Sequence, residues 1–238
     1  MNANPSLSIE HLQDLCRLVQ KCFPQAHVAI AGGATRDLLH NVPVKDIDVF
    51  VHMDDGLTWR DGYGVECHDI VPNGELYNRW YTGCEGLAAA LRSEWNGTWH
   101  DAEDDSLIDN LGNAKGYGYG AFSLVDFPQG FRMYPVQLVF IDQHPEENIR
   151  HHFDWGLSQV WVTPNQLRWT SAYYRDRDLN TLTYLPSVEP NPQRVRSSWD
   201  RLERLKVKYP KRKLVGVGRL ERMMKELLEP DQFQPSPQ

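Results

Sequence analysis

The sequence lacks the cysteine patterns of a disulfide framework or a zinc site. Its four cysteines form no C-x-x-C pair, and no second ligand pair follows the adjacent Cys67 and His68. Regular Cys or Cys/His spacings are the signature of such sites. We therefore expect the cysteines to be reduced thiols, as in proteins from reducing compartments. They are Cys16, Cys22, Cys67 and Cys84.

Long apolar runs and targeting signals are missing as well. A membrane-spanning helix needs roughly 18 or more consecutive apolar residues, and no stretch comes near that length. No signal peptide and no internal repeat is found. These features predict a cytoplasmic protein without membrane contacts, located in the host cytoplasm if the protein is viral.

Positive charge is scarce in the chain as a whole. The 25 Lys and Arg face 32 Asp and Glu, and the net charge of −7 argues against wholesale coating of nucleic acid. Residues 194–213, however, hold nine Lys and Arg and two acids, so this segment carries +7 and the remainder −14. The segment is either a solvated helical face or a wall of a cleft that contacts phosphate groups. In the second case Arg194 and Arg201 are the leading candidates for those contacts.

The stretch at residues 28–51 organises the chain. An apolar run at 28–31 predicts a buried strand, Gly32 and Gly33 follow it, and residues 35–40 read as a short helix. Glycine permits positive φ and lets a backbone approach a ligand closely. The exposed N–H groups at a helix N-terminus bind phosphate readily. The pattern therefore predicts a phosphate cradle.

A second strand, beginning after Pro43, carries Asp46 and Asp48. Side chains two residues apart on a strand point to the same face. Two carboxylates on one face favour a hard divalent cation, whose remaining ligands phosphate oxygens can supply. A phosphate-binding turn beside such a carboxylate pair provides the groups needed for metal-assisted phosphoryl chemistry.

These residues carry a family resemblance. Gly32-Gly33, twelve further residues and then Asp46-x-Asp48 resemble the signature of the DNA polymerase beta-like nucleotidyltransferases. The sequence of this stretch is most similar to that of the head domain of the tRNA CCA-adding enzymes and bacterial poly(A) polymerases. The resemblance implies an α+β fold, with a small mixed sheet flanked by helices and a short C-terminal helical extension. It also implies that Mg²⁺ or Mn²⁺ is held by Asp46 and Asp48.

The resemblance further assigns supporting roles. The triphosphate of an NTP would lie against Gly32 and Gly33, and Arg36 would add a charge-assisted contact. Asp37 and Lys45 would orient the side chains that bind the triphosphate and the metal, without contacting the nucleotide themselves. The superfamily presents a third carboxylate from a neighbouring strand, but the matching position here holds Gln137. An amide is a weaker ligand for a hard cation, which leaves full two-metal catalysis open.

Residues 151–161 loosely resemble the Arg-Arg-Asp-Phe-Thr-Ile-Asn motif of the CCA-adding enzymes. Asp154 matches the motif's Asp and Ser158 its Asn, while histidines and a phenylalanine replace the arginines. This stretch is closer to the nucleotidyltransferases of phages and large DNA viruses. Asp154 therefore lines the nucleotide pocket, supplies the missing ligand or caps a turn.

The elements expected elsewhere divide the chain into three parts. We predict a head at 1–185 with an insertion at 53–116, a basic helical extension at 186–230 and a disordered tail at 231–238. Ser8 and Thr170 are expected helix N-caps, and Pro210 is expected to stop a helix. The remaining elements are a hairpin from 117–126 and 134–141 and helices at 195–209 and 217–228.

The sequence thus predicts a nucleotidyltransferase that moves NMP from an NTP onto a hydroxyl, with release of pyrophosphate. The acceptor is an RNA 3′ end, a protein or a small molecule, and the pattern does not choose among them. Two alternatives remain. One is an impaired nucleotide-binding module, which Gln137 favours. The other is an RNA- or protein-interaction module that uses the basic segment. The sequence does not indicate an oligomeric state.

Overall fold

The computed structural model describes residues 7–53, 75–94, 98–101, 114–123, 133–141, 143–186 and 191–228. The chain forms two compact units, one from Met1–Ile149 and Val160–Arg168, the other from Arg150–Gln159 and Trp169–Gln238. The predicted tail and most of the predicted insertion lie outside the described residues. The predicted division at residues 185 and 186 stays a prediction.

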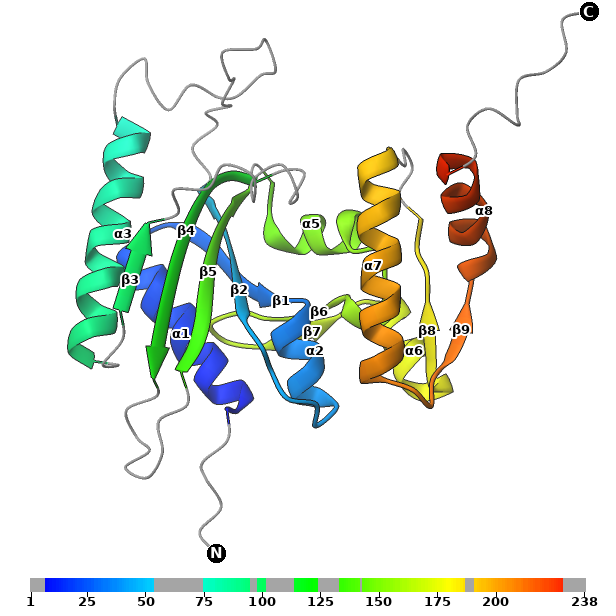
Figure 1. Cartoon of the computed structure of the whole chain (residues 1–238). Coiled ribbons are helices and arrows are strands. Elements are labelled where there is room, and N and C mark those ends of the chain that lie inside the picture. The colour runs from blue at the N-terminus through cyan, green and yellow to red at the C-terminus, as the bar shows by residue number, and fades with distance from the viewer. Residues whose placement is uncertain are drawn as a thin grey trace, which may run out of the picture. The chain divides into compact units, whose positions relative to one another are not determined.

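Within the described residues, the larger sheet has seven strands in the order β3-β4-β5-β2-β1-β6-β7 (Figure 1). Strands β2 and β5 run parallel, whereas the pairs β1–β2, β1–β6, β3–β4 and β4–β5 are antiparallel. The sheet is therefore mixed, and the α+β fold class is confirmed, as is the predicted hairpin, which is β4–β5. The strands are β1 (Ala26–Ala31), β2 (Ile47–Met53), β3 (Thr98–Asp101), β4 (Ala114–Ser123), β5 (Met133–Ile141), β6 (Val160–Val162) and β7 (Leu167–Trp169).

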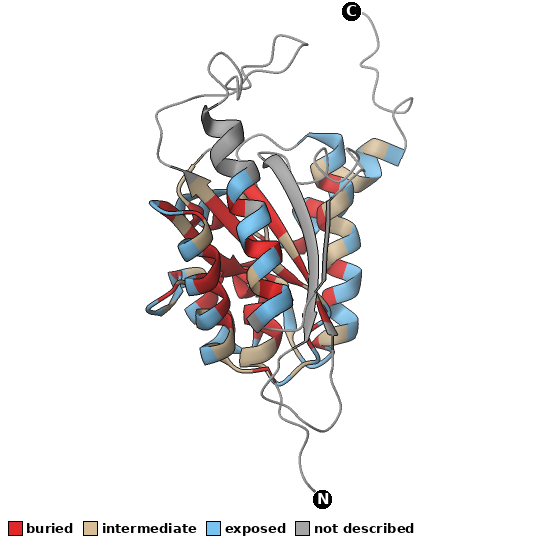
Figure 2. Ribbon diagram, turned by 90° about the vertical axis from the view of Figure 1, so that its left-hand side faces the viewer, coloured by how far each residue is buried: buried red, intermediate tan, exposed pale blue. Residues whose placement is uncertain are grey.

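Helices α1 (Ile9–Cys22) and α3 (Glu75–Glu94) pack against each other and contribute to the core of the first unit. Ser8 caps α1 by accepting a hydrogen bond from the N–H of His11, as predicted. Figure 2 shows the strands that it colours by burial as largely buried, and the helices with one buried and one exposed side. The core takes alternate residues from each central strand, including Val28, Ile30, Ile47, Val49, Val51, Val136 and Leu138.

Two short helices flank the strand ends of this unit. α2 (Gly33–Leu39) follows β1 directly, and α5 (Pro145–His152) begins in the first unit and ends in the second. None of the described helices is long and apolar enough to cross a membrane.

The second unit contains η1 (Gly156–Ser158), α6 (Ser171–Leu179), β8 (Thr181–Thr183), α7 (Pro192–Lys208), β9 (Lys213–Val215) and α8 (Val217–Leu228). The predictions of Thr170 as the cap of α6 and of the last helix are confirmed. α7 begins three residues earlier than predicted, because Asn191 caps it and Pro192 fits the first helical turn.

A buried carboxylate holds the second unit together. Asp176 on α6 is fully buried and accepts hydrogen bonds from the hydroxyls of Thr181 and Thr183 at 2.6 and 2.5 Å. It also accepts from the N–H of Thr183 at 3.0 Å. The charge is therefore satisfied by donors on β8, which fixes α6 against that strand.

Candidate functional site

The turn between β1 and α2 requires glycine at its first position. Gly32 has a φ of 73° and a ψ of −123°, a conformation that residues with a Cβ rarely adopt. At Gly33, a Cβ would lie 3.9 Å from both the Arg36 guanidinium and the Asp46 carboxylate. The first N–H groups of a helix have no acceptor within that helix. The turn therefore brings backbone donors, a cation and an anion to one place.

Thr35 anchors this turn. Its side chain is fully buried, and its hydroxyl donates to the carbonyl of Ile30 at 2.9 Å. The bond ties the first turn of α2 to the end of β1, so the two glycines keep a fixed place. Thr35 is not among the predicted site residues, although a hydroxyl residue two positions after a strand-glycine-glycine pattern is a usable signal.

Arg36 and Asp37 form a buried ion pair. The Arg36 Nε and Nη2 atoms lie 2.8 and 2.7 Å from Asp37 Oδ1, and the residues are 6% and 1% exposed. Breaking such a pair costs about 3–5 kcal/mol, because one charge is left buried alone. Asp37 therefore holds the Arg36 guanidinium in position near Gly33.

Asp46 and Asp48 flank the first residue of β2. Ile47, Val49 and Val51 point into the core, so period-two alternation puts Asp48 on the opposite face of the sheet. Both aspartates are partly exposed. Lys45 Nζ lies 3.6 Å from Asp46 Oδ2 but is 83% exposed, so this contact is weak.

Gln137 on β5 lies beside Asp48. The two Cα atoms are register partners in the parallel β2–β5 pair, and on the other side of Asp48 the partner is Ala31 of β1. Register partners in adjacent strands present their side chains on the same face. An amide therefore occupies the strand position next to Asp48, at the level where β1 leads into Gly32.

The remaining predicted residues form a separate cluster inside the second unit. Asp154 accepts hydrogen bonds from the Ser198 hydroxyl at 2.5 Å and from the Arg201 guanidinium. Arg194 Nη2 lies 3.1 Å from Nδ1 of His152. These contacts join α7 to the segment before η1. No sequence motif marks Ser198, although it precedes Arg201 by three residues and so shares its helix face.

The donor set fits a divalent cation with oxygen ligands from a substrate. Within the described residues, no group of three His, Cys, Asp or Glu side chains is arranged to hold a metal ion. Mg²⁺, however, is usually held by one or two carboxylates together with substrate phosphates. Asp46, whose carboxylate lies 3.9 Å from the Cβ position of Gly33, and Asp48 are the carboxylates that would hold such an ion.

Comparison with known proteins supports the fold. No family model matches the sequence, and curated protein sequences give no match. Among solved structures, a Thermotoga maritima CCA-adding enzyme complexed with tRNA is 15% identical with a TM-score of 0.50, over 91% of this chain and 42% of that one. The chain shares its fold with CCA-adding enzymes.

Two further structures of CCA-adding enzymes agree. The complex with CTP is 13% identical with a TM-score of 0.52, over 95% of this chain and 43% of the enzyme. The complex with ATP is 14% identical with a TM-score of 0.52, over 91% and 41%. The chain thus spans less than half the length of each enzyme. The match covers the fold of that part alone.

Proposed function

We propose that the protein is a nucleotidyltransferase that moves NMP from an NTP onto a hydroxyl acceptor and releases pyrophosphate. The approach of Asp46 to Gly33 supports this proposal most strongly. A carboxylate oxygen lies 3.9 Å from the Gly33 Cβ position, at a glycine turn where backbone donors are available. A triphosphate at this turn would have a carboxylate beside it to share a cation.

Different residues of the chain are proposed to bind the triphosphate and the metal ion. Backbone N–H groups at Gly32 and Gly33 and the Arg36 guanidinium bind the triphosphate, and Asp37 keeps Arg36 in place. Asp46 and Asp48 would hold Mg²⁺ or Mn²⁺. When bound, such an ion neutralises charge on the phosphates and lowers the pKa of the attacking hydroxyl.

The reaction is an in-line displacement at the α-phosphorus. A bond forms from the acceptor oxygen to phosphorus, and the bond from phosphorus to the oxygen bridging the α- and β-phosphates breaks. Pyrophosphate leaves with that electron pair, and the hydroxyl proton passes to solvent. Asp154 is proposed as a further nucleotide contact on the strength of the sequence resemblance, and Arg194 and Arg201 are proposed as phosphate contacts on the charge of residues 194–213.

The acceptor is an RNA 3′ end, a protein side chain or a small molecule. Structures similar in fold contain tRNA, CTP or ATP, so NTPs and RNA ends are the first substrates to test. A transfer assay with each α-labelled NTP, Mg²⁺ or Mn²⁺, and total RNA or cell lysate addresses both questions. Label should appear on RNA or protein and disappear in the Asp46→Ala/Asp48→Ala variant.

A matched control removes a carboxylate elsewhere in the same unit. Asp14 on α1 is exposed and paired with Arg17, so Asp14→Ala should keep full transfer. Absence of both transfer and NTP binding, measured by calorimetry with the full chain, would overturn the proposal.

The second candidate is a nucleotide-binding module that does not turn over. The amide of Gln137 beside Asp48 favours it, because a neutral ligand holds a hard cation less tightly than a carboxylate. NTP binding that persists without metal, together with no transfer to any acceptor, would support this candidate against the first.

A further inference from the structure

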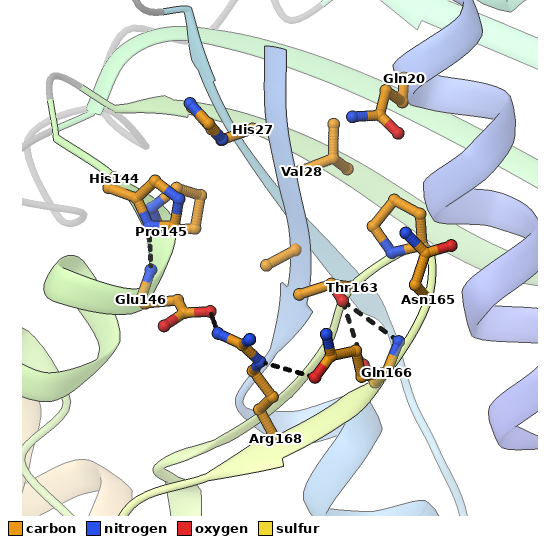
Figure 3. Close-up of a pocket in the computed structure, with 12 residues that line it drawn as sticks. Gln20, His27, Val28, His144, Pro145, Glu146, Thr163, Asn165, Gln166 and Arg168 are labelled. Atoms are coloured by element: carbon orange, nitrogen blue, oxygen red, sulfur yellow. Dashed lines mark hydrogen bonds and ion pairs between the residues drawn. The ribbon is translucent and has the colours of Figure 1, made fainter. Parts of the chain in front are cut away.

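A pocket of about 190 Å³ lies in the first unit (Figure 3). Its lining comes from α1, the middle of β1, His144 with the start of α5, and the segment from Thr163 to Arg168. None of the residues assigned above to triphosphate or metal lines it. Pockets for drug-sized ligands measure roughly 300–1,000 Å³, so this one has room for a single ring system.

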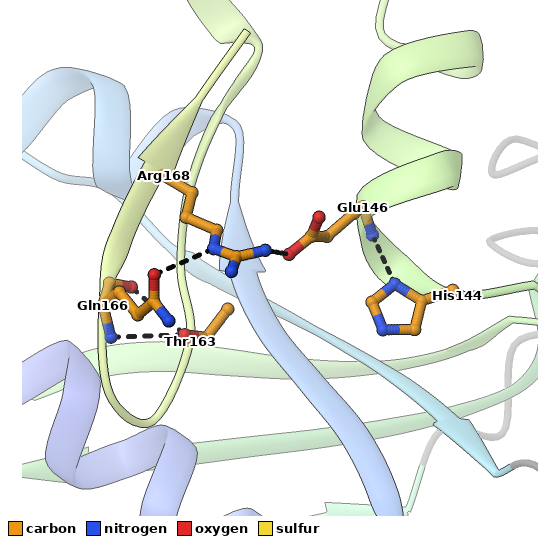
Figure 4. Close-up of polar contacts among 5 residues, drawn as sticks. All are labelled: His144, Glu146, Thr163, Gln166 and Arg168. Carbon is orange, nitrogen blue, oxygen red and sulfur yellow. Dashed lines mark hydrogen bonds and ion pairs between the residues drawn. The ribbon is translucent and has the colours of Figure 1, made fainter.

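One wall of the pocket is a connected polar chain (Figure 4). The Arg168 guanidinium donates to the Glu146 carboxylate and, through Nε at 3.1 Å, to the Gln166 side-chain oxygen. Gln166 is itself held by Thr163, whose hydroxyl accepts from the Gln166 N–H at 3.3 Å. These bonds fix the positions of the side-chain groups before any ligand arrives.

This wall has hydrogen-bonding capacity to spare. A guanidinium has five N–H donors, a carboxylate accepts several bonds, and an amide both donates and accepts. The bonds named above use only part of that capacity. The wall thus offers a donor and an acceptor side by side, while the charges of Arg168 and Glu146 cancel. It suits a neutral ligand with a mixed donor and acceptor edge better than an anion.

Two imidazole rings line another part of the pocket. The ring centroids of His27 and His144 are 4.5 Å apart, with 54° between the ring planes. The Glu146 N–H donates to Nδ1 of His144 at 3.3 Å, so the neutral ring carries its proton on Nε2. Burial lowers the pKa of His144, and His27 adds to that effect. His144 therefore offers a flat, uncharged face and one N–H donor.

We propose that this pocket binds a single nucleobase, either of a free nucleoside or of an unpaired nucleotide in an RNA strand. The flat face of the His144 imidazole stacks on the base, and the edge of the base pairs with the wall of Glu146, Arg168 and Gln166. Stacking on aromatic rings and hydrogen bonding of exposed base edges are the general means of reading unpaired bases. The proposal does not depend on nucleotidyl transfer, because the two sites share no residue.

Nuclear magnetic resonance of the full chain tests the proposal. With ¹⁵N-labelled histidine, the imidazole signals of His27 and His144 are followed while adenosine, guanosine, cytidine or uridine is added. At least one nucleoside should shift both signals. Arg168→Met should weaken that binding about tenfold, as expected for the loss of a charge-assisted hydrogen bond.

The second unit offers a matched control for Arg168. Arg177 is equally exposed, at 42% against 43%, and also pairs with a carboxylate. Arg177→Met should leave binding unchanged. His144→Ala removes the stacking ring and should also weaken binding, followed by the His27 signal, which provides a second variant if Arg168→Met does not fold. The Asp46→Ala/Asp48→Ala variant should bind the nucleoside normally, so this test stands even if transfer is never found.

Further titrations distinguish the sources of the base. Shifts with free nucleosides indicate a mononucleoside ligand, whereas shifts only with a short unstructured RNA indicate a base within a strand. Equal shifts with inorganic phosphate alone would identify an anion site and overturn the proposal. So would the absence of any shift at His27 and His144 with all four nucleosides and the RNA.

Discussion

Gln137 is the residue whose chemistry most directly affects the candidate metal site. It stands next to Asp48 on the same face of the sheet, so Gln137→Glu adds a third carboxylate. We expect the variant to bind Mn²⁺ about tenfold more tightly or better, because the ligand charge count tunes the Kd of oxygen-ligand sites. Titration followed by the electron paramagnetic resonance of free Mn²⁺ measures this without any turnover.

The same substitution should have a cost when metal is absent. Like charges on neighbouring strand positions destabilise a sheet, so the Tm in EDTA should fall below that of the wild type and recover with Mn²⁺. Gln137→Met, which removes the amide without adding charge, should not gain affinity. An unchanged Kd in Gln137→Glu would mean that the side chain at position 137 does not face the proposed cation site at Asp48.

His144 is expected to make stability depend on pH. Burial lowers its pKa from 6.5, with contributions from His27 and His52, while Glu146 and Glu147 act in the opposite direction. The folded protein therefore holds the neutral form more strongly than the unfolded chain does. This contribution is fully present above pH 6.5 and is lost as the pH falls from 6.5 through the lowered pKa.

Thermal unfolding between pH 7.5 and 5 measures this effect. The wild type should lose more Tm over that range than His144→Gln, which cannot be protonated. If the two proteins showed parallel pH profiles, His144 would not be the residue responsible.

At the scale of helices, the contact between α1 and α3 depends on a glycine. A Cβ at Gly83 would come within 2.2 Å of the Phe23 ring, which in turn packs edge-on against Phe140 with centroids 5.5 Å apart. Gly83→Ala should therefore destabilise the protein by about 1–3 kcal/mol, the usual cost of overpacking, minus the gain in helix propensity.

The matched control lies one helical turn further on. At Gly86 a Cβ would meet only Cys22, at an ordinary 3.9 Å. Gly86→Ala should be neutral or stabilise by about 0.5–1 kcal/mol, since alanine favours helix. Urea unfolding of both variants gives the comparison. Equal stabilities would show that the close packing of α3 on Phe23 does not contribute to folding.

Elements marked by local signals could be predicted, and those set by distant contacts could not. The caps Ser8 and Thr170 and the helix Val217–Leu228 follow from short-range rules of capping and periodicity. The pairing of Asp154 with Ser198 and Arg201 joins residues more than forty positions apart, and no local pattern records it. Gln137 was found because a family resemblance supplied its expected register.

The candidate site shows the same division. The glycine turn and the two aspartates are close in sequence, so spacing alone suggested that they meet. The burial of Arg36 with Asp37 could not be predicted in this way, because it depends on how α2 packs. A sequence can propose that an arginine contacts phosphate, but only packing determines which of its donors are already used.

At the scale of the whole molecule, the two units differ in net charge. The described residues of the second unit, 150–159, 169–186 and 191–228, hold fifteen Lys and Arg and seven Asp and Glu, although the whole chain carries −7. Much of this positive charge is exposed on α7 and the turn after it, for example at Arg196, Arg204 and Lys211. An exposed surplus of this kind suits a polyanionic partner.

If RNA is that partner, its affinity should depend steeply on salt and belong to the second unit. Each phosphate contact contributes a slope of about −0.7 to log K against log salt for a single strand. Arg204→Ala/Lys211→Ala should therefore weaken the binding of a single-stranded RNA and make the slope shallower by about 1.4. Fluorescence anisotropy between 50 and 300 mM salt measures both effects.

Arg92→Ala, which changes an exposed residue on α3, should alter neither the affinity nor the slope, and Asp46→Ala/Asp48→Ala should leave binding intact. Binding that persisted unchanged in Arg204→Ala/Lys211→Ala would place the RNA contact elsewhere, and the basic helix would then be only a solvated face.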